Sequence, residues 1–331
     1  MKIILKKIIS KSRILRPFRR LHQDKIIIFN YHRIRDYKKP IVFDETVFNA
    51  NTSRFIEEIK WLKKETRILS ENELIDIVYN KRPIKELCTM VTFDDGYEDN
   101  YNIAYPVLKD LNIPAMFFIP SKQINERQVG WWDLVAYFIK NTKEKEFFFN
   151  HQHFFLSDLR PLIRRFTGEL KNTEAGQIDN YLLELSDSLN VSFPSKEIQS
   201  NELMTWDQIK TMSENGMTIG SHSHDHSILS RQDKTTLKNQ LEKASFILES
   251  KINKKIQSIS YPVGGYDHFN ECTKEVAREI GLKLGFSFLT GINQYHNVDP
   301  FDVKRMSVHP EWINLDIPLA FPDIFLKSVS H

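Results

Sequence analysis

Two histidines and two adjacent aspartates are the residues of this chain best suited to chemistry. His222 and His226 are four positions apart, so one turn of chain can bring both imidazoles to the same side. Asp94 and Asp95 follow the apolar run 88–93, and neighbouring carboxylates at a strand end cannot both point the same way. Two imidazoles and one carboxylate, with an open position for water, suit a catalytic zinc or a similar divalent ion. The second carboxylate would then stay free to act as a base.

Each motif also has an ordinary structural explanation when it is taken alone. Asp95-Gly96 is a common turn dipeptide, and the histidine segment would pass for a polar loop. His224 lies between the other two histidines, so we expect its side chain to face away from them. A third motif, Pro-Val-Gly-Gly at 262–265, either presents backbone N–H groups to a developing oxyanion or simply forms a tight turn.

Short apolar runs that alternate with amphipathic segments must position these residues. Such alternation predicts parallel strands joined by crossover helices, which set active-site groups at the carboxyl ends of the strands. Periodicity alone does not decide between an open sheet and a barrel. We expect strands at 25–31, 88–93, 115–119, 217–220, 256–261 and 284–288, and helices at 53–64 (capped by Ser53), 105–111, 206–215, 234–250 (capped by Asp233) and 269–280.

The segment from about 141 to 202 breaks this rhythm, because it is polar and rich in Lys, Glu, Asn and Phe. It includes a helical patch at 159–165. We interpret it as an insertion, a small helical lid over the site.

The composition excludes several classes of protein. With 41% hydrophobic residues the chain is too apolar to be disordered, and no run approaches the roughly 20 apolar residues of a membrane-spanning helix. Cys88 and Cys272 cannot form a disulfide framework. We expect both to be reduced residues in the core of a cytoplasmic protein.

The net charge of +3 is unevenly distributed. Residues 1–25 carry nine Lys or Arg and one acid, so the remainder is mildly acidic and gives no support to a nucleic-acid partner. The basic segment 1–24 is either an amphipathic helix on an anionic membrane surface or a solvated or frayed terminus. Its apolar runs are too short for a signal peptide, so we expect a cytoplasmic location, which includes the inner face of the membrane.

Taken together, the motifs resemble those of the polysaccharide deacetylases, carbohydrate esterase family four. The specific matches are TFDDG at 92–96 and HSHDH at 222–226. The resemblance implies an α/β fold, a distorted (β/α) barrel that carries the polar insertion. It places the catalytic domain at 25–315 and a tail at 316–331. Weaker matches are NYHR at 30–33, MTWD at 204–207 and YPVG at 261–264.

The resemblance also assigns roles to individual residues. Asp95, His222 and His226 would hold the metal, Zn²⁺ in the first place with Co²⁺, Ni²⁺ or Mn²⁺ as alternatives. Asp94 would be the catalytic base that takes a proton from the attacking water. Ser223 would orient the ligand loop or touch the acetate. The backbone N–H of Val263, in the turn with Tyr261 and Pro262, would stabilise the oxyanion.

Two family positions are not filled in an obvious way. An arginine that pairs with the catalytic aspartate is replaced by Ser260, and Arg305 or Arg33 would have to take its place through space. The general acid is expected to be a late histidine, for which His309 is the first candidate. Its rivals are His296 and His32.

The pair Trp131-Trp132 has two interpretations. Trp132 either stacks on a sugar ring or anchors the core and the insertion.

The function implied is removal of an N-acetyl group from an amino sugar, with release of acetate. The substrate would be a cell-surface glycan of a bacterial envelope or its lipid-linked precursor. Two alternatives remain at this stage: hydrolysis of an O-acetyl ester or another amide on the same metal site, and a non-catalytic glycan-binding protein on a decayed scaffold.

Overall fold

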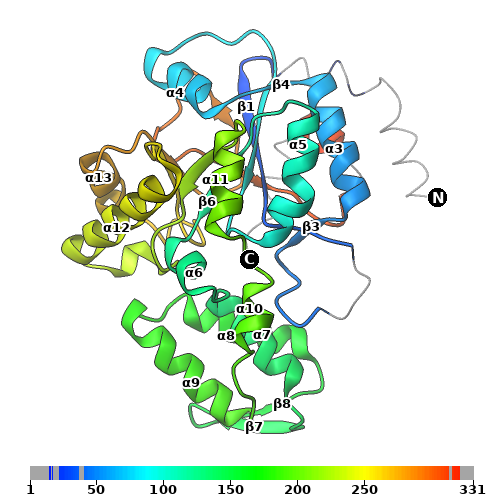
Figure 1. Ribbon diagram of the computed structural model, residues 1–331, viewed down its shortest axis with the longest axis vertical. Helices are drawn as coiled ribbons and strands as arrows, with labels where there is room; N and C mark the ends of the chain where they lie inside the picture. Colours follow the sequence, from blue (N-terminus) through cyan, green and yellow to red (C-terminus); the bar gives the residue numbers. More distant parts are fainter. Residues whose placement is uncertain (1–14, 16, 18–21, 37–40, 313–314, 321–331) are drawn as a thin grey trace.

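Buried strands form the centre of the fold in the computed structural model (Figure 1). The structure describes residues 22–36, 41–312 and 315–320 and the single positions 15 and 17. Strands buried on both faces need cover on both sides, which is typical of parallel sheets. The main sheet has the order β11-β10-β9-β6-β5-β1-β12 and is parallel except for β12. Its strands are β1 (Lys25–Tyr31), β5 (Cys88–Phe93), β6 (Met116–Ile119), β9 (Thr218–Ser221), β10 (Ser258–Ser260), β11 (Leu284–Phe286) and β12 (Asn293–Gln294).

The sheet curls, and the segment that begins at Val303 pairs with one strand on each side. Val303 pairs with Phe286 of β11, and β13 (Met306–Ser307) pairs in parallel with β1. The N–H of Val308 then donates to the carbonyl of Asn30 at 3.0 Å. This segment therefore spans the gap between β11 and β1, and the α/β fold class with a distorted barrel is confirmed.

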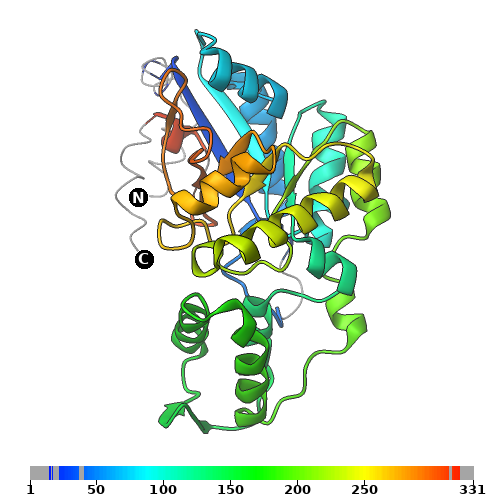
Figure 2. The ribbon, with the colours of Figure 1, turned by 90° about the vertical axis from the view of Figure 1, so that its left-hand side faces the viewer.

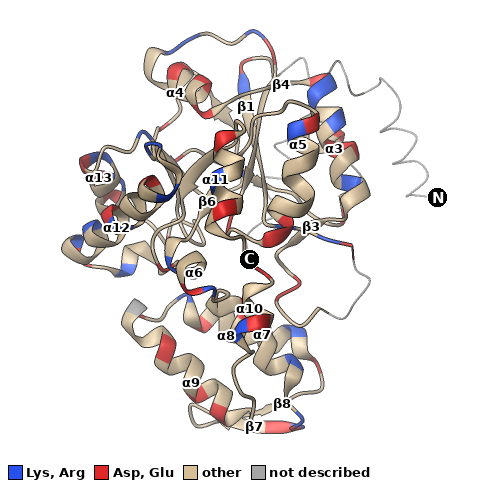
Figure 3. Ribbon diagram, viewed as in Figure 1, with Lys and Arg blue, Asp and Glu red and all other residues tan. Residues whose placement is uncertain are grey.

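Amphipathic helices cover the outside of the sheet (Figure 1). The strands predicted at 25–31 and 88–93 are confirmed to the residue. Each of the other four begins and ends within two residues of the predicted bounds. Charged residues of both signs lie on the helices, whereas the central strands carry few of them (Figure 3). The covering helices are α3 (Thr52–Glu65), α4 (Glu71–Asn80), α5 (Tyr105–Asp110), α6 (Ser121–Glu126), α11 (Trp206–Glu214), α12 (Lys234–Ile252) and α13 (Glu271–Glu279).

The helix caps show one correct and one wrong prediction. Asp233 caps α12, since its side chain accepts from the N–H groups of Thr235 and Thr236. Ser53 is not the cap of α3. Asn51 has the extended backbone that a cap requires and accepts from the N–H of Arg54 at 2.9 Å, while Ser53 lies inside the helix.

Short elements complete the described part of the sheet and its surroundings. They are β2 (Arg33–Ile34) paired with β3 (Phe48–Ala50), β4 (Arg67–Ile68) on β5, the π-helix η2 (Asn100–Ala104) that runs into α5, and the 3₁₀ turn η4 (Leu229–Arg231).

The segment predicted as a helical insertion forms a separate lobe with α7 (Trp131–Asn141), and this lobe lies below the sheet in Figures 1 and 2. It is not wholly helical. The strands β7 (Glu146–Phe149) and β8 (Gln152–Phe155) form an antiparallel hairpin, and β7 alternates between exposed and buried side chains. The remaining elements are α8 (Leu159–Leu170), η3 (Ala175–Gln177), α9 (Ile178–Ser188) and α10 (Lys196–Ser200).

Most of the basic segment 1–24 lies outside the described residues, so its amphipathic helix stays a prediction. Of the tail, the structure describes α14 (Asp316–Ala320). Within the described ranges, no helix combines the length and the apolar character needed to cross a membrane.

Candidate active site

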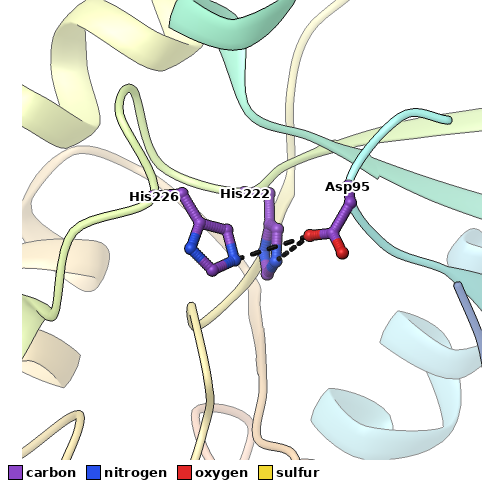
Figure 4. Close-up of side chains that lie close together, drawn as sticks. All are labelled: Asp95, His222 and His226. Atoms are coloured by element: carbon purple, nitrogen blue, oxygen red, sulfur yellow. Dashed lines mark ion pairs between the residues drawn. The ribbon is translucent and has the colours of Figure 1, made fainter. Parts of the chain in front are cut away.

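The three residues predicted to bind a metal meet where neighbouring strands end. Asp95 follows β5 and His222 follows β9, while His226 stands in the loop beyond (Figure 4). Their candidate ligand atoms all lie within 4.8 Å of one another. Nε2 of His222 is 3.3 Å and Nε2 of His226 is 3.5 Å from Oδ1 of Asp95. All three side chains are buried, so the protein already holds the group together.

The donor atoms of this group fit a divalent cation. Oδ1 of Asp95 is buried and has no hydrogen-bond partner among the described residues, which is costly for a carboxylate oxygen. Nδ1 of His222 lies 2.8 Å from the carbonyl oxygen of Ser260. A proton on that nitrogen leaves the lone pair of Nε2 directed at Asp95, as in histidines that bind metals. A cation between the three side chains would satisfy all of these atoms.

The loops that carry the group hold strained backbone. Asp95 (φ 73°), Ser223 (φ 61°), His226 (φ 59°) and Val263 (φ 59°) all adopt the left-handed conformation. That conformation is a genuine outlier for a β-branched residue such as Val263, and such strain persists only where the surroundings enforce it. The hydroxyl of Ser223 accepts from the N–H of His226 at 3.1 Å. This contact supports the predicted role of Ser223 in orienting the ligand loop.

Asp94, next to this group in the sequence, is held by an arginine. Arg305 donates from both terminal nitrogens to the two carboxylate oxygens of Asp94, each at 2.8 Å. The side chain of Arg305 is 1% exposed and that of Asp94 is 3% exposed. Burial alone would raise the pKa of Asp94, but the charge of Arg305, and after it that of His222, outweighs burial and holds the pKa below its usual value. Asp94 is therefore ionised at neutral pH.

Arg305 also organises the surroundings of Asp94. Its guanidinium donates to Oδ1 of Asn30 (2.7 Å), to the hydroxyl of Ser260 (2.7 Å) and to the carbonyl of Ser287 (2.9 Å). The sequence leaves Arg305 and Arg33 as candidates for this position, and the structure brings Arg305 to Asp94. Arg33 forms its ion pairs elsewhere, with Asp99 and Glu202.

The histidine candidates for the general acid are separated by the structure. His32 places Nε2 4.0 Å from Oδ2 of Asp94, and its side chain is 17% exposed. His309 is exposed, its Nδ1 accepts from the N–H of Glu311, and no contact joins it to Asp94 within the described residues. His296 is exposed on the loop after β12. The structure thus brings His32 to the site and leaves the other two outside it, although the role of each stays a prediction.

The third histidine of the loop faces away from the group, as expected. Nδ1 of His224 lies 2.8 Å from the hydroxyl of Ser121 at the start of α6. The backbone N–H of Lys122 donates to the carbonyl of His224 at 2.7 Å. These contacts fasten the histidine loop to α6.

Trp132 packs against a candidate metal ligand. Its ring centroid is 4.3 Å from that of His226, and the side chain is 8% exposed. The indole N–H donates to the hydroxyl of Tyr97, which donates in turn to Asp133, both at 2.8 Å. The structure therefore favours the anchoring interpretation of Trp132 over an exposed sugar platform.

Asp133 is a buried carboxyl that sequence reasoning did not single out. Burial is the main reason why its pKa is raised to about 7, and neighbouring Asp44 raises it further while Arg33 opposes both. The one signal in the sequence is an acid directly after two tryptophans at the start of an apolar stretch.

The remaining candidates lie in the turn after β10 and differ in how deeply they are buried. Tyr261 is fully buried, stacks on Phe269 and donates to the carbonyl of Phe301, so it belongs to the core and not to the candidate ligand group. Pro262 is buried beside it. Val263 is partly exposed, and its N–H donates to no acceptor in the described part of the chain. Gly264 fixes this turn, since a Cβ there would lie 2.5 Å from the backbone nitrogen of Phe288.

Comparison with known proteins places these features in a family. The family model described as polysaccharide deacetylase matches residues 81–159 and 167–285. The Bacillus subtilis (strain 168) protein YxkH, which carries a polysaccharide deacetylase name, is 24% identical over 256 residues. This alignment covers 75% of the chain and 63% of YxkH.

A second relative is the poly-beta-1,6-N-acetyl-D-glucosamine N-deacetylase of Staphylococcus aureus (strain MSSA476). It is 27% identical over 124 residues, which are 34% of the chain and 42% of the relative. The matched regions thus span less than two thirds of either relative.

Two solved structures share the fold. The Streptococcus pyogenes deacetylase PplD, in complex with acetate, aligns with a TM-score of 0.57 at 19% identity and covers 87% of this chain and 93% of its own. IcaB from Ammonifex degensii aligns with a TM-score of 0.57 at 18% identity and covers 90% and 96%. At these identities the likeness concerns the fold alone.

Replacing Arg305 with Met should destabilise the protein at pH 7, because it leaves the buried carboxylate of Asp94 without a partner. The expected loss is about 3 to 5 kcal/mol in the free energy of unfolding, measured in urea. In the Asp94→Asn background the same substitution should cost clearly less. Equal losses in both backgrounds would show that the two side chains are not coupled.

Asp133→Asn should change how stability depends on pH. The unfolded chain releases the Asp133 proton near pH 4, whereas the folded protein keeps it until about pH 7. This carboxyl therefore lowers the free energy of unfolding as the pH rises through that window, and its effect is constant above it. The free energy of unfolding of the variant minus that of the wild type should rise between pH 4 and 7, by a few kcal/mol at most, since one pKa unit is worth about 1.4 kcal/mol. Parallel stability curves would rule this out.

Proposed function

The chain belongs to the polysaccharide deacetylase family, and from this premise we propose that it is a metal-dependent N-deacetylase that releases acetate from an N-acetylated amino sugar. The family supports a hydrolase. The observation that carries the finer proposal is the buried group of Asp95, His222 and His226, next to which Asp94 pairs with Arg305 and stays outside the candidate ligand set. A protein that only bound glycans would gain nothing from burying these charges side by side.

Asp95, His222 and His226 would hold the metal in this proposal. Imidazole nitrogens and a carboxylate oxygen suit Zn²⁺, with Co²⁺, Ni²⁺ and Mn²⁺ as alternatives. When bound, such an ion polarises a carbonyl and lowers the pKa of water toward neutrality. Ser260 and Ser223 keep the ligands in place, through the carbonyl that faces Nδ1 of His222 and the hydroxyl that receives the N–H of His226.

Asp94 acts as the general base in our proposal. It is ionised, it directly precedes Asp95, and Arg305 fixes the plane of its carboxylate. These features hold a proton acceptor beside the position from which water attacks the acetyl carbonyl. The lowered pKa makes Asp94 a weaker base than a free carboxylate, so the attacking water must itself be acidified.

The other side of the reaction needs a donor to the oxyanion and a proton for the amine. The N–H of Val263, which the strained turn keeps free of partners among the described residues, is suited to the oxyanion. His32 lies closest to Asp94 of the three histidine candidates, and we propose that it protonates the leaving nitrogen. The exposure of His309 does not favour it in this role.

An amino-sugar polymer or its lipid-linked precursor is the substrate class that we propose. The support is the similarity of 34% of the chain to a relative named as a poly-beta-1,6-N-acetyl-D-glucosamine N-deacetylase. A panel of N-acetylated and O-acetylated oligosaccharides, analysed by mass spectrometry for loss of acetyl groups, tests this proposal. Loss of acetyl from nitrogen supports it, whereas loss from oxygen alone would replace it by an esterase.

Asp95→Ala should lose the bound metal, because it removes one of three ligands and leaves two imidazoles without their carboxylate. We expect a clear decrease in metal per protein, measured by elemental mass spectrometry after dialysis. Asp94→Asn is the matched control and should keep its metal. A metal content in Asp95→Ala equal to that of the wild type would exclude this ligand set.

Asp94→Asn should keep the fold and lose the reaction. The expected decrease in turnover is about 10²- to 10⁴-fold, the usual contribution of one general base. Asp110→Asn, at the exposed end of α5, serves as the control and should keep its rate. Full activity in Asp94→Asn would remove this residue from the mechanism.

A further inference from the structure

His32, the residue proposed to protonate the leaving nitrogen, lies where the chain changes its sheet partners. The residue before it, Tyr31, ends β1, which pairs with β5, and the carbonyl of Tyr31 accepts from the N–H of Asp94 at 3.0 Å. The residue after it, Arg33, begins β2, which pairs with β3. His32 is therefore a single residue between two strands that belong to different sheets.

Two buried asparagine side chains bind the backbone of His32. Its N–H donates to Oδ1 of Asn49 at 2.6 Å, and the amide of Asn100 donates to its carbonyl at 2.7 Å. The amide of Asn49 also donates to the carbonyl of Val308 at 2.6 Å, which fixes the orientation of that side chain. Residues of β3 and η2, 17 and 68 positions away in the sequence, thus hold the peptide groups on both sides of His32.

The residue at the start of η2 binds the same short stretch at two further points. Asp99 accepts from the backbone N–H of Ile34 at 3.0 Å and from Nε of Arg33 at 2.9 Å. Helix η2 is a π-helix, a rare form that is frequent at functional sites. Because η2 begins shortly after Asp95, the stretch of chain that supplies the two aspartates also holds the candidate acid in place.

The imidazole of His32 has little support of its own. Within the ranges that the structure describes, its ring nitrogens form no hydrogen bond. Nε2 lies 4.0 Å from Oδ2 of Asp94, and the ring packs edge-to-face on Phe288 with 5.5 Å between the centroids. A proton donor must lie within hydrogen-bond reach of the group that it protonates, and a displacement of about 1 Å can cost roughly 10²-fold in rate. The position of the ring thus depends on the backbone that the two asparagines hold.

We propose that Asn49 and Asn100 are positioning residues for the reaction, which fix the backbone of His32 and so hold its imidazole beside Asp94. Neither asparagine belongs to the candidate ligand group, so both act through His32 and not through the metal. This inference rests on the proposed function for the role of His32. It predicts that the two side chains affect the rate of the chemical step and leave the binding of substrate and metal unchanged.

A double-mutant comparison with a pentamer of β-1,6-linked N-acetylglucosamine tests this role. Asn100→Leu removes the amide and keeps a branched side chain, and it should lower kcat about 10- to 100-fold with KM and metal content unchanged. His32→Ala alone should lose about 10²- to 10⁴-fold. In the His32→Ala background Asn100→Leu should have no further effect, because the imidazole that it positions is gone.

A second measurement does not depend on activity. The full chain is labelled at histidine and phenylalanine and studied by NMR without added metal. The rings of His32 and Phe288 should show a nuclear Overhauser contact, identified by its absence in His32→Ala, and Asn100→Leu should weaken or abolish it. If thermal unfolding shows that Asn100→Leu is not folded, both measurements are made with Asn49→Leu, for which we expect the same changes.

Gln199→Met is the matched control, because Gln199 is also buried and its amide donates to the carbonyl of Pro194 within the lobe at 2.8 Å. It should keep both the rate and the ring contact. A further loss of kcat in the His32→Ala background, or a ring contact that Asn100→Leu leaves unchanged, would overturn the positioning role. The proposed function fails separately, if the wild type releases no acetate from any N-acetylated member of the panel. The NMR measurement then still decides whether the asparagines hold the ring of His32.

Discussion

The two adjacent carboxylates of Asp94 and Asp95 are buried side by side, and the rest of the site is organised around that constraint. Neither charge can be left without compensation in a buried place, and two charges so close would otherwise raise each other's pKa. The protein solves the problem separately for each. Asp94 receives a bidentate arginine, and Asp95 faces two imidazoles in a geometry that suits a cation. Chemically equal side chains thus have different partners.

The way in which the sheet curls supplies the arginine. Arg305 lies between Val303, which pairs with β11, and β13, which pairs with β1, so the segment that bridges the two strands also carries the counter-charge of Asp94. The positions of the two charged groups are therefore fixed by backbone hydrogen bonds of the sheet and not by a flexible loop. Family members that carry the arginine near the third motif would reach the same end from another strand, and Ser260 here still contacts the guanidinium.

How far the sequence predicted this structure depends on the range of the interactions. The strands at 25–31 and 88–93 are correct to the residue because they are buried apolar runs with polar ends. The sequence does not predict the hairpin at 146–155, because its phenylalanines are consecutive and stand in a segment with helical patches, so no apolar–polar alternation marks the strands. The contact of Arg305 with Asp94 joins residues 211 positions apart, so no local sequence pattern predicts it. The exposure of His309 depends on the same long-range packing.

The sheet and the lobe contribute different parts of the candidate site. The strand ends supply the buried charges, which tolerate little change because each one compensates another. Helix α7 connects the two parts, since Trp132 packs on His226 while its indole N–H is fixed through Tyr97 to Asp133 on the same helix. A change in the lobe that moves α7 would therefore reach a candidate metal ligand.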